Sequence, residues 1–293
     1  MSPINRAFRR RNASSLRVLA YHGVDDPDRF SQQLGHLSRW FLPVTLDDVA
    51  QSVERREPLA PQSVLVTFDD GHRSVLDSAL PLLRERGIPA VAFVATGLID
   101  TDAPFWWDEV DELIAAGGTA TQLAGVAPQD VVRTLKSEPD ASRLAVIDRL
   151  RETASRPAGR ANHLRRADLQ ALESGGVAIG SHTITHPMLP ACSADKRRDE
   201  IEGSHAHLTA MLGHPPVAFA YPNGAEDASV TEVVREAGYQ LAFMFDHRLQ
   251  QNPIDDPFRI SRVRVNSTTP LARFEAIVSG AHPWFHRGVM RRN

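Results

Sequence analysis

Residues 64–71 read Val-Leu-Val-Thr-Phe-Asp-Asp-Gly, an apolar run that ends in two adjacent carboxylates and a glycine. A run of this length, rich in valine and phenylalanine, is typical of a buried parallel strand. Adjacent strand residues point to opposite sides, but Gly71 permits a turn that would bring Asp69 and Asp70 into one site. The alternative is a solvated Asp-Asp-Gly turn.

Further apolar runs of similar length lie at 17–21, 90–95, 177–181, 217–221, 240–245 and 260–265. Helical patterns separate most of these runs, and those over 75–86, 194–212 and 229–237 each end at a glycine. Alternation of strand and helix predicts an α/β fold with a parallel sheet. Seven strands are fewer than a complete barrel needs, so we expect a distorted seven-stranded (β/α) barrel. The carboxyl ends of such strands form the active face, where Asp69 and Asp70 would lie.

The segment 100–167 interrupts this rhythm with helical patterns near 109–116, 129–136 and 141–154. We interpret it as a helical insertion within one α/β domain that covers residues 17–280. Residues 1–16 are predicted to be a basic N-terminal tail, and residues 281–293 a C-terminal tail.

Composition excludes several classes of protein. The 293 residues are 42% apolar and 24% charged, which is ordinary for a globular chain and rules out disordered and collagen-like sequences. The net charge of −3 argues against a nucleic-acid partner. Cys192 is the single cysteine, so no disulfide forms within the chain.

No run of about 18 apolar residues occurs, so no membrane span is predicted. The N-terminal residues are basic and lack an apolar core, so we expect no secretory signal and a cytoplasmic location. Arginines gather at both ends of the chain. If the ends meet, they would form a basic patch able to make weak peripheral contact with an anionic membrane; solvated tails are the alternative.

A second polar stretch, 180–187, reads Gly-Ser-His-Thr-Ile-Thr-His-Pro and follows the strand predicted at 177–181. His182 and His186 are therefore expected at the same end of the sheet as the two aspartates. Two neutral imidazoles and one carboxylate form a common three-ligand set for Zn²⁺ that leaves a position open for water. The alternative is a pair of surface or core histidines.

Together these motifs resemble those of the polysaccharide deacetylase family, the NodB homology domain of carbohydrate esterase family 4. Residues 67–71 match its Thr-Phe-Asp-Asp-Gly motif, and residues 182–186 match His-Ser/Thr-x-x-His. The resemblance implies that Asp69 is the general base. It also implies that Asp70, His182 and His186 hold a divalent metal, with Zn²⁺ expected and Co, Ni or Mn as alternatives. Spacing alone does not assign these roles to the two aspartates.

The third family motif, Arg-x-Pro-Tyr-Gly, is altered to Ala-Tyr-Pro-Asn-Gly at 220–224. In the family the arginine tethers the catalytic aspartate, and the backbone N–H of the tyrosine donates to the oxyanion. We expect Asn223 to supply that N–H and Arg262 to replace the tether. An aromatic-Pro-x-Gly turn resembles the branch of the family that acts on exopolysaccharides, which makes Tyr221 a candidate substrate contact.

Other candidates rest on weaker patterns. No clear Leu-x-His motif occurs, so His282 is a candidate general acid, with a packing role for the C-terminus as the alternative. His22 ends the first predicted strand and is expected to line the site unless it hydrogen-bonds locally. Trp107 in the insertion is a candidate sugar-stacking platform, with anchoring of the insertion as the alternative.

The resemblance implies a metal-dependent hydrolase that removes N-acetyl groups from an amino sugar, in a polysaccharide or its precursor. Metal-bound water would attack the amide carbonyl with Asp69 as base. The expected partner is an N-acetylated glycan or a lipid- or nucleotide-linked amino sugar. A deformylase or cyclic-amide hydrolase of the same fold is one alternative. A carbohydrate-binding pseudoenzyme is another, because the family arginine is lost.

Overall fold

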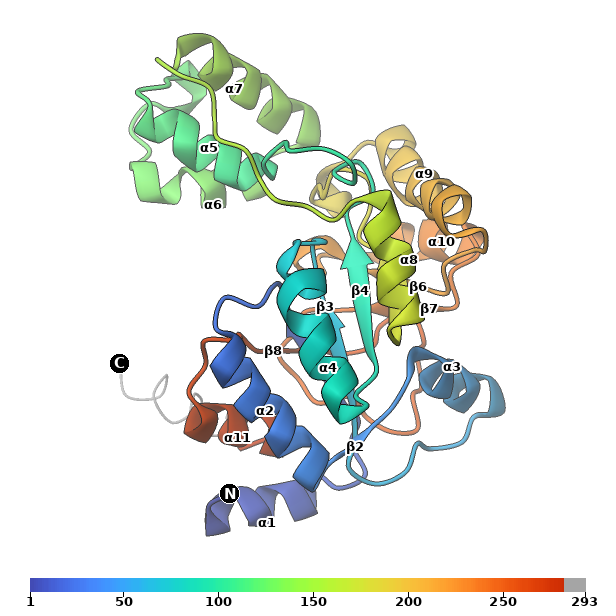
Figure 1. The fold of residues 1–293 in the computed structure, drawn as a ribbon. Helices are drawn as coiled ribbons and strands as arrows, with labels where there is room; N and C mark the ends of the chain where they lie inside the picture. Colours follow the sequence, from blue (N-terminus) through green and yellow to red (C-terminus); the bar gives the residue numbers. More distant parts are fainter. Residues whose placement is uncertain (282–293) are drawn as a thin grey trace.

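Parallel strands form one curled sheet in the order β7-β6-β5-β4-β3-β1-β8 in the computed structural model, which describes residues 1–281 (Figure 1). A further short strand, β2, pairs with β3 beside this path. The strands are β1 Arg17–Tyr21, β2 Leu42–Pro43, β3 Ser63–Phe68, β4 Ala90–Val94, β5 Val177–Ser181, β6 Ala218–Ala220, β7 Leu241–Phe243 and β8 Val263–Arg264.

The segment that leads into β8 closes the sheet on itself. Ile260 bridges Phe243 of β7 in parallel, and three residues later Val263 pairs with Leu19 of β1. Side chains from every long strand alternate between an interior cluster and an outer face covered by helices, as the pleat requires. The fold is the distorted (β/α) barrel that the sequence predicts, with β2 as an additional strand.

Helices cover the outside of the barrel. Helix α2 shows why they form where they do: the Asp26 carboxylate accepts from the Arg29 N–H at its start, and Phe30, Leu34 and Leu37 bury one face. The covering helices are α2 Pro27–Trp40, the π-helical turn η1 Val75–Ala79, α4 Leu80–Arg86, α8 Arg166–Ser174, α9 Ala194–Leu212, α10 Ala228–Glu236 and α11 Leu271–Ser279. Helix α3 Leu46–Arg55 instead packs Leu46 and Val49 onto the interior cluster.

The insertion forms a small helical layer above the carboxyl ends of the strands (Figure 1). Its apolar side chains pack mainly on each other, with Val110, Leu113 and Leu150 almost fully buried. It therefore has a core of its own. Its helices are α5 Trp106–Ala115, α6 Val131–Lys136 and α7 Asp140–Thr153, with short 3₁₀ turns at Thr121–Leu123 and Pro128–Asp130.

The N-terminal residues expected as a tail contain a helix, α1 Pro3–Arg11, which packs against α11. The Ser2 hydroxyl caps this helix, and the fully buried Arg17 donates to the Asn12 and Val278 carbonyls. The expected C-terminal tail lies, after Ala281, outside the described residues, so the basic patch stays a prediction. Within residues 1–281, no helix has the length and apolar character needed to cross a membrane.

Candidate active site

A left-handed turn at the end of β3 presents both aspartates. Asp69 continues the strand ladder, its N–H donating to the Tyr21 carbonyl at 2.8 Å. Asp70 then has φ 76° and Gly71 φ 85°. A Cβ on Gly71 would lie 3.3 Å from the Val94 side chain, so glycine suits this position on both counts. This turn brings the two carboxylates to one cavity.

The loop between His182 and His186 is also strained and is held by a buried carboxylate. Thr183 has φ 69° and His186 φ 57°. Glu200 of α9, fully buried, accepts from the Thr185 N–H at 2.8 Å and from the Thr185 hydroxyl at 2.6 Å. Sequence reasoning missed Glu200, since nothing in the helical pattern over 194–212 links it to this loop. Backbone strain at residues with positive φ is common at functional sites, and it persists only where hydrogen bonds such as those to Glu200 hold the backbone.

Asp70, His182 and His186 converge as a metal-binding group would. Asp70 Oδ1 lies 3.6 Å from Nε2 of each histidine, and ligand atoms of all three residues lie within 4.8 Å of one another. Asp70 Oδ1 is buried without a hydrogen-bond partner in the described chain. His182 Nδ1 lies 2.8 Å from the Ala220 carbonyl, which assigns its proton to Nδ1 and leaves the Nε2 lone pair toward Asp70.

The protonation states of Asp70, His182 and His186 also suit the binding of a metal cation between them. Burial, followed by the charges of Asp69 and Asp108, raises the pKa of Asp70 well above its usual range. Burial lowers the pKa of His182 to about 4 and that of His186 well below its ordinary value. Both imidazoles are therefore neutral at pH 7, as metal ligands must be. A buried carboxylate that lacks a partner and two neutral imidazoles fit a divalent cation.

Arg262 makes the contact expected of the missing family arginine. Its Nη1 donates to Asp69 Oδ1 at 2.6 Å and its Nη2 to Oδ2 at 2.8 Å. The guanidinium is fully buried, donates from Nε to the Met244 carbonyl, and lies near the rings of Phe93 and Phe245. Burial raises the pKa of Asp69, but the charge and hydrogen bonds of Arg262, with smaller contributions from His182 and His22, together leave it lowered. Asp69 is thus a fixed, ionised carboxylate.

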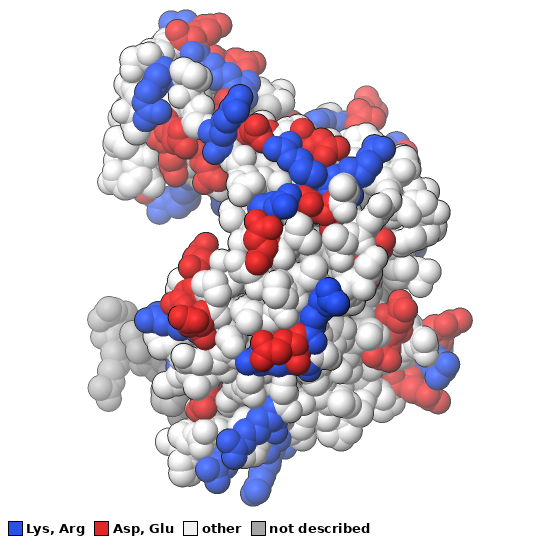
Figure 2. Space-filling model, in the orientation of Figure 1, with Lys and Arg blue, Asp and Glu red and all other residues white. Residues whose placement is uncertain are grey.

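A cavity of about 510 Å³ surrounds these groups, between the strand ends and the insertion. The space-filling view shows a recess below the insertion (Figure 2). Among the expected site residues outside the metal group and Asp69, His22, Trp107 and Asn223 line it. Its full lining is His22, Asp25, Asp69, Asp70, Trp107, Lys136, His182, His186, Asn223, Phe245, Arg264, Asn266 and Thr268.

Tyr221 is an expected site residue that does not line this cavity. It is fully buried against Phe219 and Tyr239, with its hydroxyl 3.0 Å from the Phe258 carbonyl. Its placement corrects the expectation of a substrate contact, because the residue before the turn still follows the strand alternation and points into the core. His282 lies outside the described residues.

Lys136 is a cavity residue that sequence reasoning missed. It comes from α6 of the insertion, and its ammonium donates to Asn223 Oδ1 at 2.8 Å and lies 6.0 Å from the centre of the Trp107 ring. Its rarity was the only sequence signal, since the chain has just one other lysine, Lys196. Its role depends on how the insertion folds over the barrel, which the helical pattern does not specify.

Comparison with known proteins agrees with this arrangement. A family model described as polysaccharide deacetylase matches residues 56–242. The chain belongs to this family. A segment of 116 residues is 33% identical to chitin deacetylase 2 of Saccharomyces cerevisiae, covering 39% of this chain and 37% of the yeast protein. The match therefore spans little more than a third of that relative.

Solved structures share the fold over most of the chain. IcaB from Ammonifex degensii has a TM-score of 0.64 at 22% identity, with 92% of this chain and 97% of that chain covered. The Streptococcus pyogenes deacetylase PplD, solved in complex with acetate, has a TM-score of 0.62 at 18% identity, covering 87% and 94%. At these identities the likeness supports the fold alone.

Proposed function

We propose that the chain is a metal-dependent hydrolase that removes N-acetyl groups from an amino sugar of a polysaccharide or its precursor. The observation that carries the proposal is the pairing of Asp69 with Arg262 directly beside the group Asp70, His182 and His186. One carboxylate is held ionised and free of the metal group, while the other lacks any partner but the two imidazoles. This division of labour suits hydrolysis of an amide.

Asp70, His182 and His186 would hold the divalent cation, with Zn²⁺ the expected ion because its preferred ligands include imidazole nitrogen and carboxylate oxygen. When bound there, it lowers the pKa of a water molecule and polarises the acetamide carbonyl. Asp69 accepts the proton of the attacking water at a carboxylate oxygen. Arg262 fixes the orientation of that carboxylate through two parallel hydrogen bonds.

The cavity walls position the sugar. Asn223 lines the cavity and has φ 54° within the 3₁₀ turn Pro222–Gly224, and its backbone N–H is the proposed donor to the oxyanion. Trp107 is half-buried at the cavity and stacks on Phe105 with ring centres 4.4 Å apart. Phe105 thus supports the indole of Trp107. The face of this indole that is turned to the cavity is proposed to contact the apolar face of a sugar ring.

The test is acetate release by chelator-stripped protein, measured with and without added Zn²⁺ or Co²⁺. N-acetylglucosamine oligomers, an acetylated xylan and a lipid-linked N-acetylhexosamine form the substrate panel. Metal-dependent acetate from at least one substrate is expected. Metal bound at about one ion per chain with no acetate would contradict deacetylation and favour deformylation or opening of a cyclic amide. Failure to take up metal would favour a carbohydrate-binding protein.

A further inference from the structure

Two cations from separate parts of the fold line the catalytic cavity without an acidic partner. Lys136 belongs to the insertion and Arg264 to β8. Neither side chain forms an ion pair with any described residue, although most arginines on the insertion do, such as Arg133 with Asp130. Burial is the main cause that lowers the pKa of Lys136; the Asp70 carboxylate opposes this, and the charge of Arg264 adds a smaller lowering. Like charges brought together in this way favour an anionic ligand between them.

The carboxylates of the cavity do not remove this excess. Asp69 is already paired with Arg262, and Asp70 faces the two imidazoles. Asp25 is the remaining acidic residue of the lining, against two unpaired cations. A divalent cation beside Asp70 would add further positive charge. With such an ion bound, the positive charges of Lys136, Arg262, Arg264 and the ion together exceed the negative charges of the three carboxylates that line the cavity, and a cavity of this kind concentrates anions.

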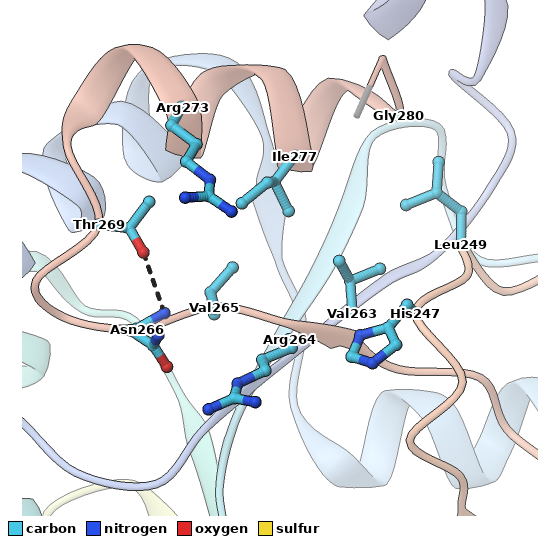
Figure 3. A pocket seen from close by; sticks show the side chains of 10 residues that line it. All are labelled: His247, Leu249, Val263, Arg264, Val265, Asn266, Thr269, Arg273, Ile277 and Gly280. Carbon is cyan, nitrogen blue, oxygen red and sulfur yellow. Dashed lines mark hydrogen bonds between the residues drawn. The ribbon is translucent and has the colours of Figure 1, made fainter. Parts of the chain in front are cut away.

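A second cavity of about 550 Å³ adjoins the catalytic one and continues this pattern. Arg264 and Asn266 line both cavities. In Figure 3, Arg273 reaches from α11 into the space above the strand, while Arg264 leaves the strand on its other side. No Asp or Glu occurs among its described lining residues.

The adjoining cavity also has apolar walls. Leu249, Val263, Val265 and Ile277 line it together with the polar side chains of His247 and Thr269. A volume of this size, apolar with a few placed polar groups, is that of a ligand subsite. An occupant there would meet apolar surface, with the Arg273 guanidinium at the rim.

We propose that the substrate is an anionic glycan, whose phosphate or carboxylate next to the acetamido sugar is bound by Lys136 and Arg264. The adjoining cavity then receives the group that follows, with Arg273 at its rim. This inference rests on the proposed deacetylation and narrows its substrate from glycans in general to those with a negative charge near the reacting sugar. Charge-assisted hydrogen bonds from Lys and Arg supply the selectivity.

Direct binding to the zinc-loaded protein tests it without turnover. Calorimetry at low ionic strength compares N-acetylglucosamine 1-phosphate with the methyl glycoside of N-acetylglucosamine, which has the same sugar with an uncharged methyl group in place of the phosphate. A second pair compares N-acetylglucosamine joined to glucuronic acid with the same sugar joined to glucose. We expect the charged member of at least one pair to bind about tenfold more tightly. The pair that shows the preference separates phosphate from carboxylate.

Variants locate the preference. Lys136→Gln and Arg264→Gln should each remove most of the preference for the charged ligand, and Lys136→Arg should retain this preference. Arg133→Gln, on the same helix as Lys136 but 79% exposed, is the matched control and should retain it too. Metal content and melting temperature of each variant show that the fold and the cation site are intact.

Equal binding within both pairs would overturn the inference. So would a preference that persists in both Lys136→Gln and Arg264→Gln, because the anion would then be bound by the metal ion. Failure of deacetylation is a separate result, since binding is measured without acetate release. An anionic preference with no acetate from any substrate would refute the proposed function and leave the anion site standing.

Discussion

Arg262 and Asp69 stand 193 positions apart in the sequence and form a buried, bidentate ion pair at the carboxyl-terminal end of the barrel strands. The position of the family arginine is occupied by Ala220, on β6. The guanidinium instead comes from the segment between β7 and β8, which closes the sheet. The same contact with the proposed base is thus made from a different element.

Removing this guanidinium should damage both stability and activity. Arg262→Ala leaves the Asp69 carboxylate buried without a counter-charge, which should cost about 3–5 kcal/mol in the free energy of unfolding. Arg262→Lys keeps the charge but cannot form both hydrogen bonds, so we expect a partial recovery of stability with kcat still lowered. Denaturant unfolding and kcat check the two effects. Arg262→Lys with wild-type kcat would show that orientation of Asp69 is unimportant.

Zinc binding should stabilise the folded chain through the three proposed ligands. Because a ligand that binds only the native state adds about 2.7 kcal/mol at a hundred times its dissociation constant, Zn²⁺ should raise the melting temperature of stripped protein. His182→Ala and Asp70→Asn should abolish this rise. His214→Ala, at an exposed histidine away from the cavity, is the control and should preserve it. An undiminished rise in His182→Ala would place the ion elsewhere.

The two adjacent tryptophans should have different roles. Trp106 is 8% exposed, and its indole N–H donates to the His186 carbonyl at 3.1 Å, so Trp106→Ala should cost about 3–5 kcal/mol of stability. Trp107 lines the cavity, so Trp107→Ala should mainly raise KM, by about tenfold, with a small change in melting temperature. Equal effects of both variants on KM would argue that Trp107 only anchors the insertion.

Cys192 should be inert in the folded protein. Burial is the main cause that raises the pKa of its thiol to about 12, above the ordinary 9.0. At pH 8 only about one thiol in 10⁴ is then ionised, and the thiolate is the species that reacts. Native protein should therefore resist iodoacetamide at pH 8, with labelling that grows as pH rises, whereas protein in guanidinium chloride reacts readily. Rapid labelling of the native protein at pH 8 would contradict this environment.

Strands that are long and apolar could be predicted from sequence, and two of them, β1 and β5, have the expected bounds. β2 could not, because two residues carry no periodic signal. Helix α2 was missed although Asp26 and Pro27 mark its start and its apolar residues recur at helical spacing. Helix α1 carries a local start signal, Ser2 followed by Pro3, but its packing against α11, which makes it part of the domain, is not visible in the local sequence.

Within the site, the sequence motifs predict those residues that come directly after the carboxyl end of a strand. Asp70 and His182 meet because β3 and β5 end at the same edge of the sheet. Lys136 and Glu200 could not be predicted, since each reaches the site from a helix through tertiary packing. The expected substrate contact of Tyr221 is not found, because the turn at 222–224 begins after this residue and leaves its side chain in the core.

The general base is the central claim, and Asp69→Asn tests it most directly. The variant keeps the size of the side chain and an oxygen that accepts from Arg262, but it cannot take a proton. With zinc content equal to that of the unaltered chain, we predict that acetate release from the best substrate of the panel falls by about 10²–10⁴. Acetate release at the unaltered rate by zinc-loaded, folded Asp69→Asn would contradict the account.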